Sequence, residues 1–268
     1  MFLAVRILLV GITVGALAIP SSAQVTSVPN PSSSMIALPD APQPAFNQDA
    51  VSLRNTPRHL LEDQKAIWTS PARLTLRDLR WITPLAVATG VSVATDHHTM
   101  SSVVSHDASF NQTSIDASNG LTGGLVALPV ALYGLGVVRG NEHAQDTGLL
   151  GGEALVDSLV VQEGLKLIFW RERPSQDNAR GLFFQGSAGS DSSFPSNHSV
   201  LAWSSAAVIA SEYPSRWTQV GVYSLATGVS LTRVMGQQHF PTDALIGSAA
   251  GWLIGHYVVR THRKIHSH

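Results

Sequence analysis

The sequence contains no cysteine among its 268 residues. This absence excludes disulfide-stapled folds, thiolate nucleophiles and zinc sites with cysteine ligands. Charge is also scarce, because Asp, Glu, Lys and Arg make up 13% of the chain, and 17 basic residues stand against 18 acidic ones. The sequence therefore predicts no nucleic-acid partner, and any affinity for phosphate must come from a local cluster of cations. With 44% hydrophobic residues, the chain can build a large apolar core.

The N-terminus has the three-part layout of a secretory signal. Arg6 supplies an early positive charge, an apolar run covers residues 7–19, and small residues lead to Ala23. We predict a signal peptide over residues 1–23, with export to the periplasm or cell envelope. An uncleaved membrane anchor is the alternative, but the 13-residue run is short for a bilayer core of about 30 Å.

The stretch 24–58 is rich in proline and serine and is predicted to be a disordered linker. A helical domain is expected over residues 59–268, because apolar stretches recur between helix breakers and none alternates as a half-buried strand would. The fold class expected is therefore an all-α helical bundle. The apolar stretches cover residues 60–68, 79–95, 121–138, 149–170, 199–210, 217–234 and 244–259.

The lengths of the charge-free runs bear on whether this bundle lies in water or in lipid. Only the run 117–138 is long enough to cross a bilayer, and it contains Asn119 and Pro129. We therefore expect it to be the buried central helix of a soluble bundle, with an integral membrane bundle whose active site faces outward as the alternative. Three glycines fall four apart on one helix face and predict a close helix contact: Gly247, Gly251 and Gly255.

Three short segments place charged and polar residues within otherwise apolar sequence, where core packing alone does not explain them. In the first, Lys166 and Arg173 are seven positions apart and are expected on one face of a helix that Pro174 ends. Two cations at the C-terminal end of a helix also interact favourably with the helix dipole. The alternative is therefore a purely structural role, in which these cations pair with Glu163 or Glu172.

The second segment places Ser196, Asn197 and His198 directly before an apolar run. Ser196 is predicted to cap a helix whose free backbone N–H groups form a seat for an anion, with His198 at its edge. The alternative is an ordinary capped helix start.

In the third segment, Arg233, His239 and Asp243 precede the last apolar run. We expect the Asp243 carboxylate to hold one ring nitrogen of His239, leaving the other nitrogen free as a base or nucleophile. A capping aspartate beside a surface histidine is the alternative.

The three segments together suit the transfer of a phosphoryl group. Lys166, Arg173 and Arg233 could bind the equatorial oxygens with the Ser196 hydroxyl and nearby N–H groups, while the two histidines attack and protonate. Such a site needs no metal.

The ordered set Lys-x6-Arg-Pro, Pro-Ser-x-His and Arg-x5-His-x3-Asp resembles the signature of the type 2 phosphatidic acid phosphatase and vanadium haloperoxidase superfamily. The resemblance implies an all-helical phosphatase domain in which His239 forms a phosphohistidine, Asp243 orients it and His198 protonates the leaving oxygen. It further implies that a set of residues binds the phosphate, namely Lys166, Arg173, Ser196, Asn197 and Arg233. The family usually has Gly where this chain has Asn197 and Ser where it has Thr232.

The resemblance implies a metal-independent phosphatase without a cofactor, acting on a phosphorylated lipid such as phosphatidic acid, on an isoprenoid pyrophosphate or on a small soluble ester. Membrane association would accompany a lipid substrate. Two alternatives are a haloperoxidase, in which vanadate takes the place of phosphate, and a non-catalytic envelope protein that binds anionic lipid.

Two further segments are expected to matter less. Asp96, His97, His98, His106 and Asp107 include metal-ligand types without a diagnostic spacing and are predicted to lie in a solvated loop. The segment 176–193 is expected to be a lid or a contact for an acyl chain, and the alternative is a plain connector.

Overall fold

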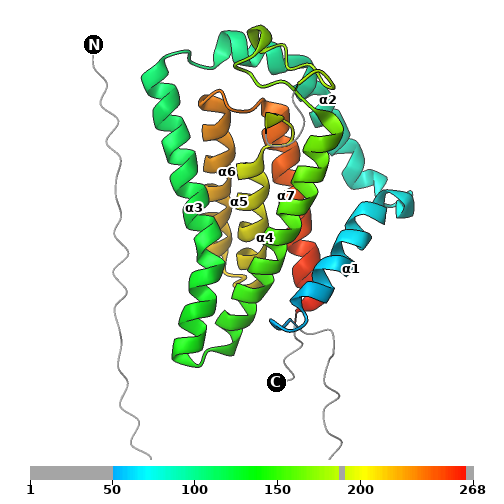
Figure 1. Ribbon diagram of the computed structural model, residues 1–268, viewed down its shortest axis with the longest axis vertical. Coiled ribbons are helices and arrows are strands. Elements are labelled where there is room, and N and C mark those ends of the chain that lie inside the picture. Colours follow the sequence, from blue (N-terminus) through cyan, green and yellow to red (C-terminus); the bar gives the residue numbers. More distant parts are fainter. Residues whose placement is uncertain (1–50, 187–190, 264–268) are drawn as a thin grey trace, which may run out of the picture. The chain divides into compact units, whose positions relative to one another are not determined.

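The computed structural model describes residues 51–186 and 191–263, and these residues form helices joined by loops, with no strand among them. The prediction of an all-α fold is confirmed (Figure 1). The signal peptide predicted over residues 1–23 lies outside the described residues. The helices are α1 (Thr56–Thr69), α2 (Leu79–His98), α3 (Ala108–Arg139), α4 (Glu142–Phe169), α5 (Asn197–Glu212), α6 (Arg216–Met235) and α7 (Pro241–His262).

Only the last residues of the predicted linker 24–58 are described, and they pack on the helices. Helix α1 already begins at Thr56, with Pro57 in its first turn. Val51 is fully buried, and its backbone N–H donates to the carbonyl oxygen of His262, 3.2 Å away. The packing of an apolar side chain therefore orders the backbone before residue 59.

Side-chain caps begin several of the helices. The Asp107 carboxylate accepts a hydrogen bond from the backbone N–H of Phe110 and begins α3, and Asn141 in the same way begins α4. Ser215 caps α6. These side chains satisfy N–H groups that have no partner within the helix. The apolar stretch 121–138 predicted this helix. Because Asp107 caps it, α3 begins at Ala108, thirteen residues before that stretch.

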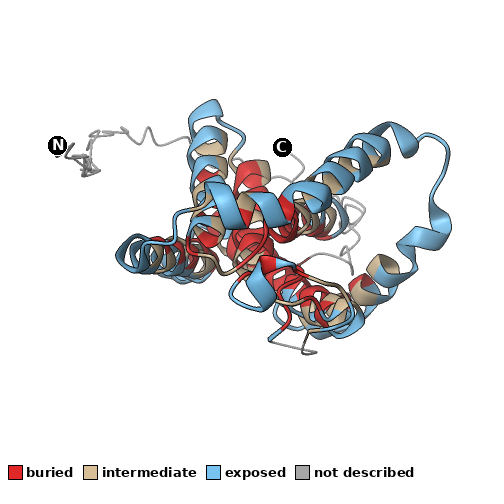
Figure 2. Cartoon of the chain, turned by 90° about the horizontal axis from the view of Figure 1, so that it is seen from above, coloured by how far each residue is buried: buried red, intermediate tan, exposed pale blue. Residues whose placement is uncertain are grey.

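Helix α5 is the central element, and α3, α4, α6 and α7 all pack against it. Its surface consists largely of buried serine and alanine, which let neighbouring helices approach closely. The predicted glycine contact lies here: a Cβ atom added to Gly251 of α7 would be 2.1 Å from the carbonyl oxygen of Val200 in α5. Figure 2 shows buried residues concentrated on the inner helices and exposed residues on the outer ones.

The expectation that residues 117–138 form the buried central helix is wrong. They belong to α3, which packs against α4, α5 and α6 along one narrow face only. Val130, Leu135 and Val138 are 71%, 51% and 83% exposed. Among the described residues, α3 is also the single helix whose length and composition would allow it to cross a membrane.

Candidate active site

Arg171 lies at the centre of a buried network that joins three parts of the chain. Its side chain is 1% exposed. One terminal nitrogen is 2.6 Å from Asp243 Oδ1, the other is 2.7 Å from Asp96 Oδ2, and Nε donates to the carbonyl oxygen of Gly181 at 3.0 Å. A planar guanidinium presents its donors in fixed directions, so this one side chain links α2, α7 and the loop after α4.

Two aromatic rings stack on the guanidinium of Arg171. The rings of Phe183 and Phe240 have their centroids 4.5 and 4.1 Å from its central carbon. Phe183 belongs to the segment 176–193, whose described residues therefore support Arg171. Cation–π contacts of this kind are strongest where water is excluded.

Asp96 does not lie in a solvated loop, contrary to our expectation. It belongs to α2, is 1% exposed, and accepts hydrogen bonds from Arg171 and from the backbone N–H of Thr242. Of its neighbours, His98 ends α2, His97 Nδ1 faces the carbonyl oxygen of Ala179, and Asp107 caps α3. Sequence reasoning missed both Asp96 and Arg171, whose pairing joins positions 75 residues apart.

His239 is buried in the loop between α6 and α7, and its orientation differs from the one expected. Its Nδ1 lies 2.7 Å from the backbone carbonyl oxygen of Ser193 and 3.8 Å from Asp243 Oδ2, so the predicted direct hydrogen bond to Asp243 is not formed. Asp243 Oδ2 instead accepts from the Ser193 hydroxyl at 2.5 Å and from the Phe240 backbone at 2.9 Å. Asp243 thus positions His239 through Ser193.

The contact with Ser193 fixes the tautomer of the His239 ring. A carbonyl oxygen only accepts hydrogen bonds, so Nδ1 carries the proton and Nε2 keeps its lone pair. Burial lowers the pKa of His239 to about 4, although the nearby Asp243 carboxylate acts in the opposite direction. At neutral pH the ring is therefore uncharged, with one nitrogen available as a nucleophile.

His198 stands in the first turn of α5, and its Nε2 is 2.9 Å from Asn119 Oδ1 on α3. The same amide oxygen accepts from Arg233 at 3.5 Å, and Arg233 also donates to the Ser118 hydroxyl at 3.2 Å. Burial and the positive charge of Arg233 lower the pKa of His198 to about 4. Asn119 thus connects the second histidine to a cation, a role that its place in an apolar run did not reveal.

Three cations share the space around the two histidines. Burial lowers the pKa of Lys166, and the charge of Arg173 lowers it further. Burial and Arg173 also lower the pKa of Arg233 to about 10. Arg173 lowers the pKa of both other cations, and all three cations lower the pKa of His198. The three therefore form a local cluster of positive charge, which favours binding of an anion with more than one negative charge.

Lys166 and Arg173 reach this cluster from different elements, so the expectation that one helix carries both is wrong. Helix α4 ends at Phe169, and Trp170 has a φ of 37°, which ends the helix before Pro174. The chain then runs beside residues 182–186, where the Glu172 N–H donates to the carbonyl oxygen of Leu182. Arg173 extends from this loop and donates to the carbonyl oxygens of Asp191 and Gln238.

Ser196 caps α5 as predicted and is fully buried. Its hydroxyl accepts hydrogen bonds from the backbone N–H and the hydroxyl of Ser199, and its own N–H donates to the carbonyl oxygen of Asp243. Asn197 begins the helix, and its Oδ1 is buried without a hydrogen-bond partner among the described residues. The start of α5 therefore lies directly against the start of α7.

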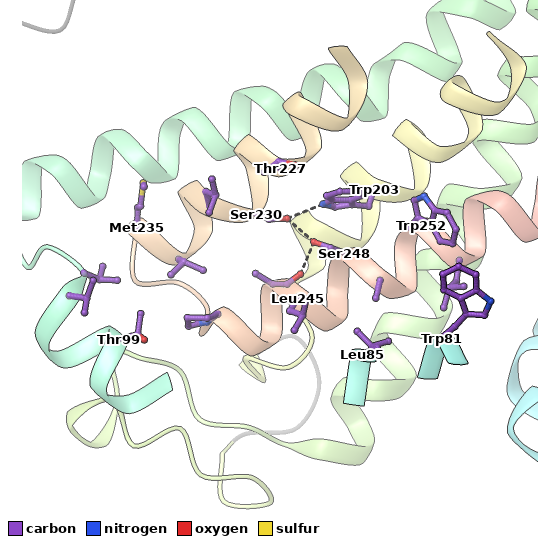
Figure 3. A pocket seen from close by; sticks show the side chains of 18 of the residues that line it. Trp81, Leu85, Thr99, Trp203, Thr227, Ser230, Met235, Leu245, Ser248 and Trp252 are labelled. Atoms are coloured by element: carbon purple, nitrogen blue, oxygen red, sulfur yellow. Dashed lines mark hydrogen bonds between the residues drawn. The ribbon is translucent and has the colours of Figure 1, made fainter. Parts of the chain in front are cut away.

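An apolar groove of about 1390 Å³ opens between α2, α6 and α7 (Figure 3). Pro241 and Ala244, on either side of Asp243 in the first turn of α7, form part of its wall. Serine hydroxyls connect the groove with the cap of α5, because Ser199 bonds to Ser230, which bonds to Ser248. Large apolar side chains dominate the lining. Among them are Trp81, Leu85, Leu231, Met235, Leu245 and Trp252.

Comparisons with known proteins show which family and which proteins this chain resembles. The profile of the PAP2 superfamily matches residues 148–267. A Lipid A 1-phosphatase of Porphyromonas gingivalis is 35% identical over 65 residues, which are 24% of this chain and 15% of that protein. The chain thus spans less than a sixth of that relative's length. A crystal structure of a transmembrane PAP2 type phosphatidylglycerolphosphate phosphatase from Bacillus subtilis aligns with a TM-score of 0.47 and 20% identity, over 76% of this chain and 94% of that one.

Proposed function

We propose that this chain, which matches the PAP2 superfamily profile over residues 148–267, is a phosphatase that removes a phosphate group from a lipid by way of a phosphohistidine. One observation carries the proposal. The buried His239 ring has Nδ1 fixed on Ser193, and Nε2 forms no hydrogen bond with any described residue. The same site holds Lys166, Arg173 and Arg233.

In the first step, the lone pair of His239 Nε2 attacks phosphorus and forms a P–N bond, while the P–O bond to the leaving group breaks. Protonated His198 gives its proton to the leaving oxygen, so the lipid departs as a neutral alcohol, or as a phosphate if the substrate is a pyrophosphate. The Ser193 carbonyl accepts a stronger hydrogen bond from Nδ1 as the ring becomes positive.

In the second step, neutral His198 takes a proton from a water molecule, and the water oxygen attacks phosphorus. The P–N bond breaks, phosphate is released, and His239 returns to its neutral form while His198 is again protonated. Lys166, Arg173, Arg233 and the N–H groups around Ser196 and Asn197 would hold the equatorial oxygens throughout. These steps use no metal ion.

His198 must carry a proton in the first step, although its pKa is about 4 with no anion bound. A bound phosphate dianion supplies negative charge within the cation cluster and offsets the effect of Arg233. Substrate binding therefore raises the pKa of His198. As a result, His198 gains the proton it needs as general acid only when there is a leaving group to protonate.

A lipid is favoured over a soluble ester because the apolar groove shares the first turn of α7 with the phosphate site. Acyl or isoprenoid chains could lie between α2, α6 and α7 while the headgroup reaches His239. The relative from P. gingivalis carries the name of a lipid phosphatase, which agrees with this choice.

Export and membrane association complete the proposal. The predicted signal peptide would place the enzyme in the periplasm or cell envelope. Exposed apolar side chains on α3 and around the groove would then contact a lipid surface, where the substrate resides.

The proposal is tested by phosphate release from phosphatidic acid in detergent micelles and from the soluble ester p-nitrophenyl phosphate. His239→Ala should lower kcat/KM by at least about 1,000-fold on both substrates, since the attacking nitrogen is lost. His106→Ala, which changes an exposed loop histidine, is the matched control and should retain full activity. Undiminished turnover by His239→Ala would remove the assigned nucleophile, and binding of phosphatidic acid by the wild type without turnover would favour the non-catalytic alternative.

The role of the groove has its own pair of variants on α6. Leu231 lines the groove and is 53% exposed, whereas Leu225 lies outside it and is 44% exposed. Leu231→Glu should raise KM for phosphatidic acid about tenfold or more, because lipid chains in the groove would bury the new carboxylate and remove its hydration. KM for p-nitrophenyl phosphate should stay unchanged, because this ester has no chain to place in the groove. Leu225→Glu should change neither. Equal effects of the two variants on the lipid would contradict the assignment.

A further inference from the structure

A second buried polar cluster lies at the far end of α7 from His239. It comprises His59 and Asp63 of α1, Glu153 and Asp157 of α4, and His262 at the end of α7, and each of these residues is at most 3% exposed. Nineteen positions separate His262 from Asp243, which corresponds to about 28 Å along the helix. The cluster therefore cannot contact a phosphate group held at His239.

The two histidines are held in fixed orientations. Their rings stack with centroids 4.0 Å apart and planes 11° from parallel. His262 Nε2 lies 2.9 and 2.8 Å from the two oxygens of Asp63, and His59 Nδ1 lies 3.1 Å from Glu153 Oε1, which also accepts from the Thr56 hydroxyl at 2.7 Å.

Two atoms of this cluster have no hydrogen-bond partner in the described part of the chain. They are His262 Nδ1 and Glu153 Oε2, and both are buried. A buried polar atom without a partner destabilises a fold by about 1–3 kcal/mol. One ligand atom from each of His59, Glu153 and His262 lies within 4.8 Å of the others, so the unpartnered atoms belong to groups that already converge.

From this convergence we propose that His59, Glu153 and His262 bind one divalent transition-metal ion, for which Zn²⁺ is the best match. Two imidazole nitrogens and a carboxylate oxygen are a common ligand set for zinc. The Asp63 carboxylate faces Nε2 of His262, which directs the Nδ1 lone pair toward the ion, in the carboxylate–histidine–metal arrangement that is usual around bound zinc.

The charges of the cluster also favour a cation. It contains three carboxylates, of Asp63, Glu153 and Asp157, and within the described residues no lysine or arginine forms an ion pair with them. A divalent ion would compensate this buried negative charge. Because its ligands come from α1, α4 and α7, the ion would fasten α1 to the helical bundle, and its role would be structural.

The test uses the full purified chain, dialysed against a chelator and then titrated with Zn²⁺ alone. We expect calorimetry to show one zinc per chain at this site. We also expect an increase of about 5–10 °C in the unfolding midpoint at a free zinc concentration near 100 times Kd. His59→Gln and His262→Gln should each lose this binding and this shift. His143→Gln, a histidine of α4 outside the cluster, should retain both.

Two further outcomes keep the inference distinct from the proposed function. His239→Ala should bind zinc as the wild type does, because its substitution lies in the other site. If zinc neither binds the wild-type chain nor raises its unfolding midpoint, the cluster is a hydrogen-bonded network only and the inference is overturned. Zinc binding that survives both cluster variants would overturn it equally. Neither result depends on whether the chain releases phosphate.

Discussion

At the scale of single residues, Arg171 has more partners than any other side chain described in the site. Two carboxylates, a carbonyl oxygen and two aromatic rings surround its guanidinium. Its charge is therefore compensated within the fold and is not available for phosphate. We interpret Arg171 as the residue that positions Asp243, and through Ser193 also His239.

The stability of the fold should depend strongly on Arg171. Arg171→Met leaves Asp96 and Asp243 buried without their cation, and losing one partner of a buried ion pair destabilises by about 3–5 kcal/mol. Arg180→Met removes an exposed arginine that pairs with Asp177 and should change the free energy of unfolding by less than about 0.5 kcal/mol. Denaturant titration measures both values, and similar effects would contradict the account.

The pH dependence of turnover should reflect the low pKa of His239. Neutral His239 is the nucleophile, and burial lowers its pKa from the ordinary 6.5 to about 4. Protonated His198 is required as well, and its pKa in the free enzyme is also about 4. Because kcat/KM reports the free enzyme, kcat/KM should rise as pH falls from 7 to 5, when more His198 is protonated, and should fall as pH drops through about 4. The measurement is kcat/KM for p-nitrophenyl phosphate across this range, corrected for the ionisation of the ester. A fall in kcat/KM centred near pH 6.5 would show that the His239 ring is hydrated, which would contradict its burial.

The sequence motifs point to the residues around the proposed phosphate site, but they do not reveal the residues that support that site. Spacing alone singled out Lys166, His198, His239 and their neighbours, and the fold brings both histidines into one site with the cations. Asp96 could not be recognised, since its importance depends on a pairing with Arg171 across 75 positions. The proposed metal site is similarly hidden, because its ligands are about a hundred residues apart along the chain.

At the scale of elements, the contact between α5 and α7 determines how the two halves of the site meet. The start of α5 carries Ser196 and His198, and the start of α7 carries Asp243. Glycines on α7 let the two helices approach so closely that Gly247 faces the backbone of Ser196. The distance between these helices therefore sets the geometry of the proposed phosphate site.

A methyl group at Gly251 should disturb this contact. The added carbon would lie 2.1 Å from the carbonyl oxygen of Val200, a backbone atom that cannot rotate away, so we expect Gly251→Ala to destabilise by about 2 kcal/mol or more and to lower kcat. Gly152→Ala, in the interior of α4 with no atom within 4 Å of its added carbon, should instead stabilise by up to about 1 kcal/mol. Thermal unfolding and phosphate release compare the two, and an unaffected Gly251→Ala would contradict close packing.

The helices themselves were predictable from apolar stretches between breakers, but the exposure of α3 was not. Apolar composition indicates that a helix avoids water, and it does not say whether protein or lipid covers it. A helix with small and apolar residues on all sides, such as α3, fits either environment. Only the packing of α4, α5 and α6 against one of its faces reveals the uncovered remainder.

At the scale of the whole molecule, the exposed apolar side chains and the groove both fit an enzyme that works at a lipid surface. The chain without its predicted signal peptide, residues 24–268, should float with phospholipid vesicles in a density gradient. Replacing the exposed Val130, Leu135 and Val138 of α3 by serine should reduce the floating fraction severalfold. Replacing Gln112 and Thr113, exposed polar residues of the same helix, by serine should leave it unchanged. If residues 24–268 stay at the bottom of the gradient, membrane association is contradicted.

The central claim is that phosphate passes through a covalent bond to His239, and rapid quenching measures this most directly. The enzyme is mixed with phosphatidic acid, stopped with base, under which phosphohistidine survives, and analysed by mass spectrometry of its peptides. The account predicts one phosphate on His239, attached through Nε2, and none in the His239→Ala variant. Phosphate on a different residue, or turnover with no phosphorylated histidine at any time, would contradict it.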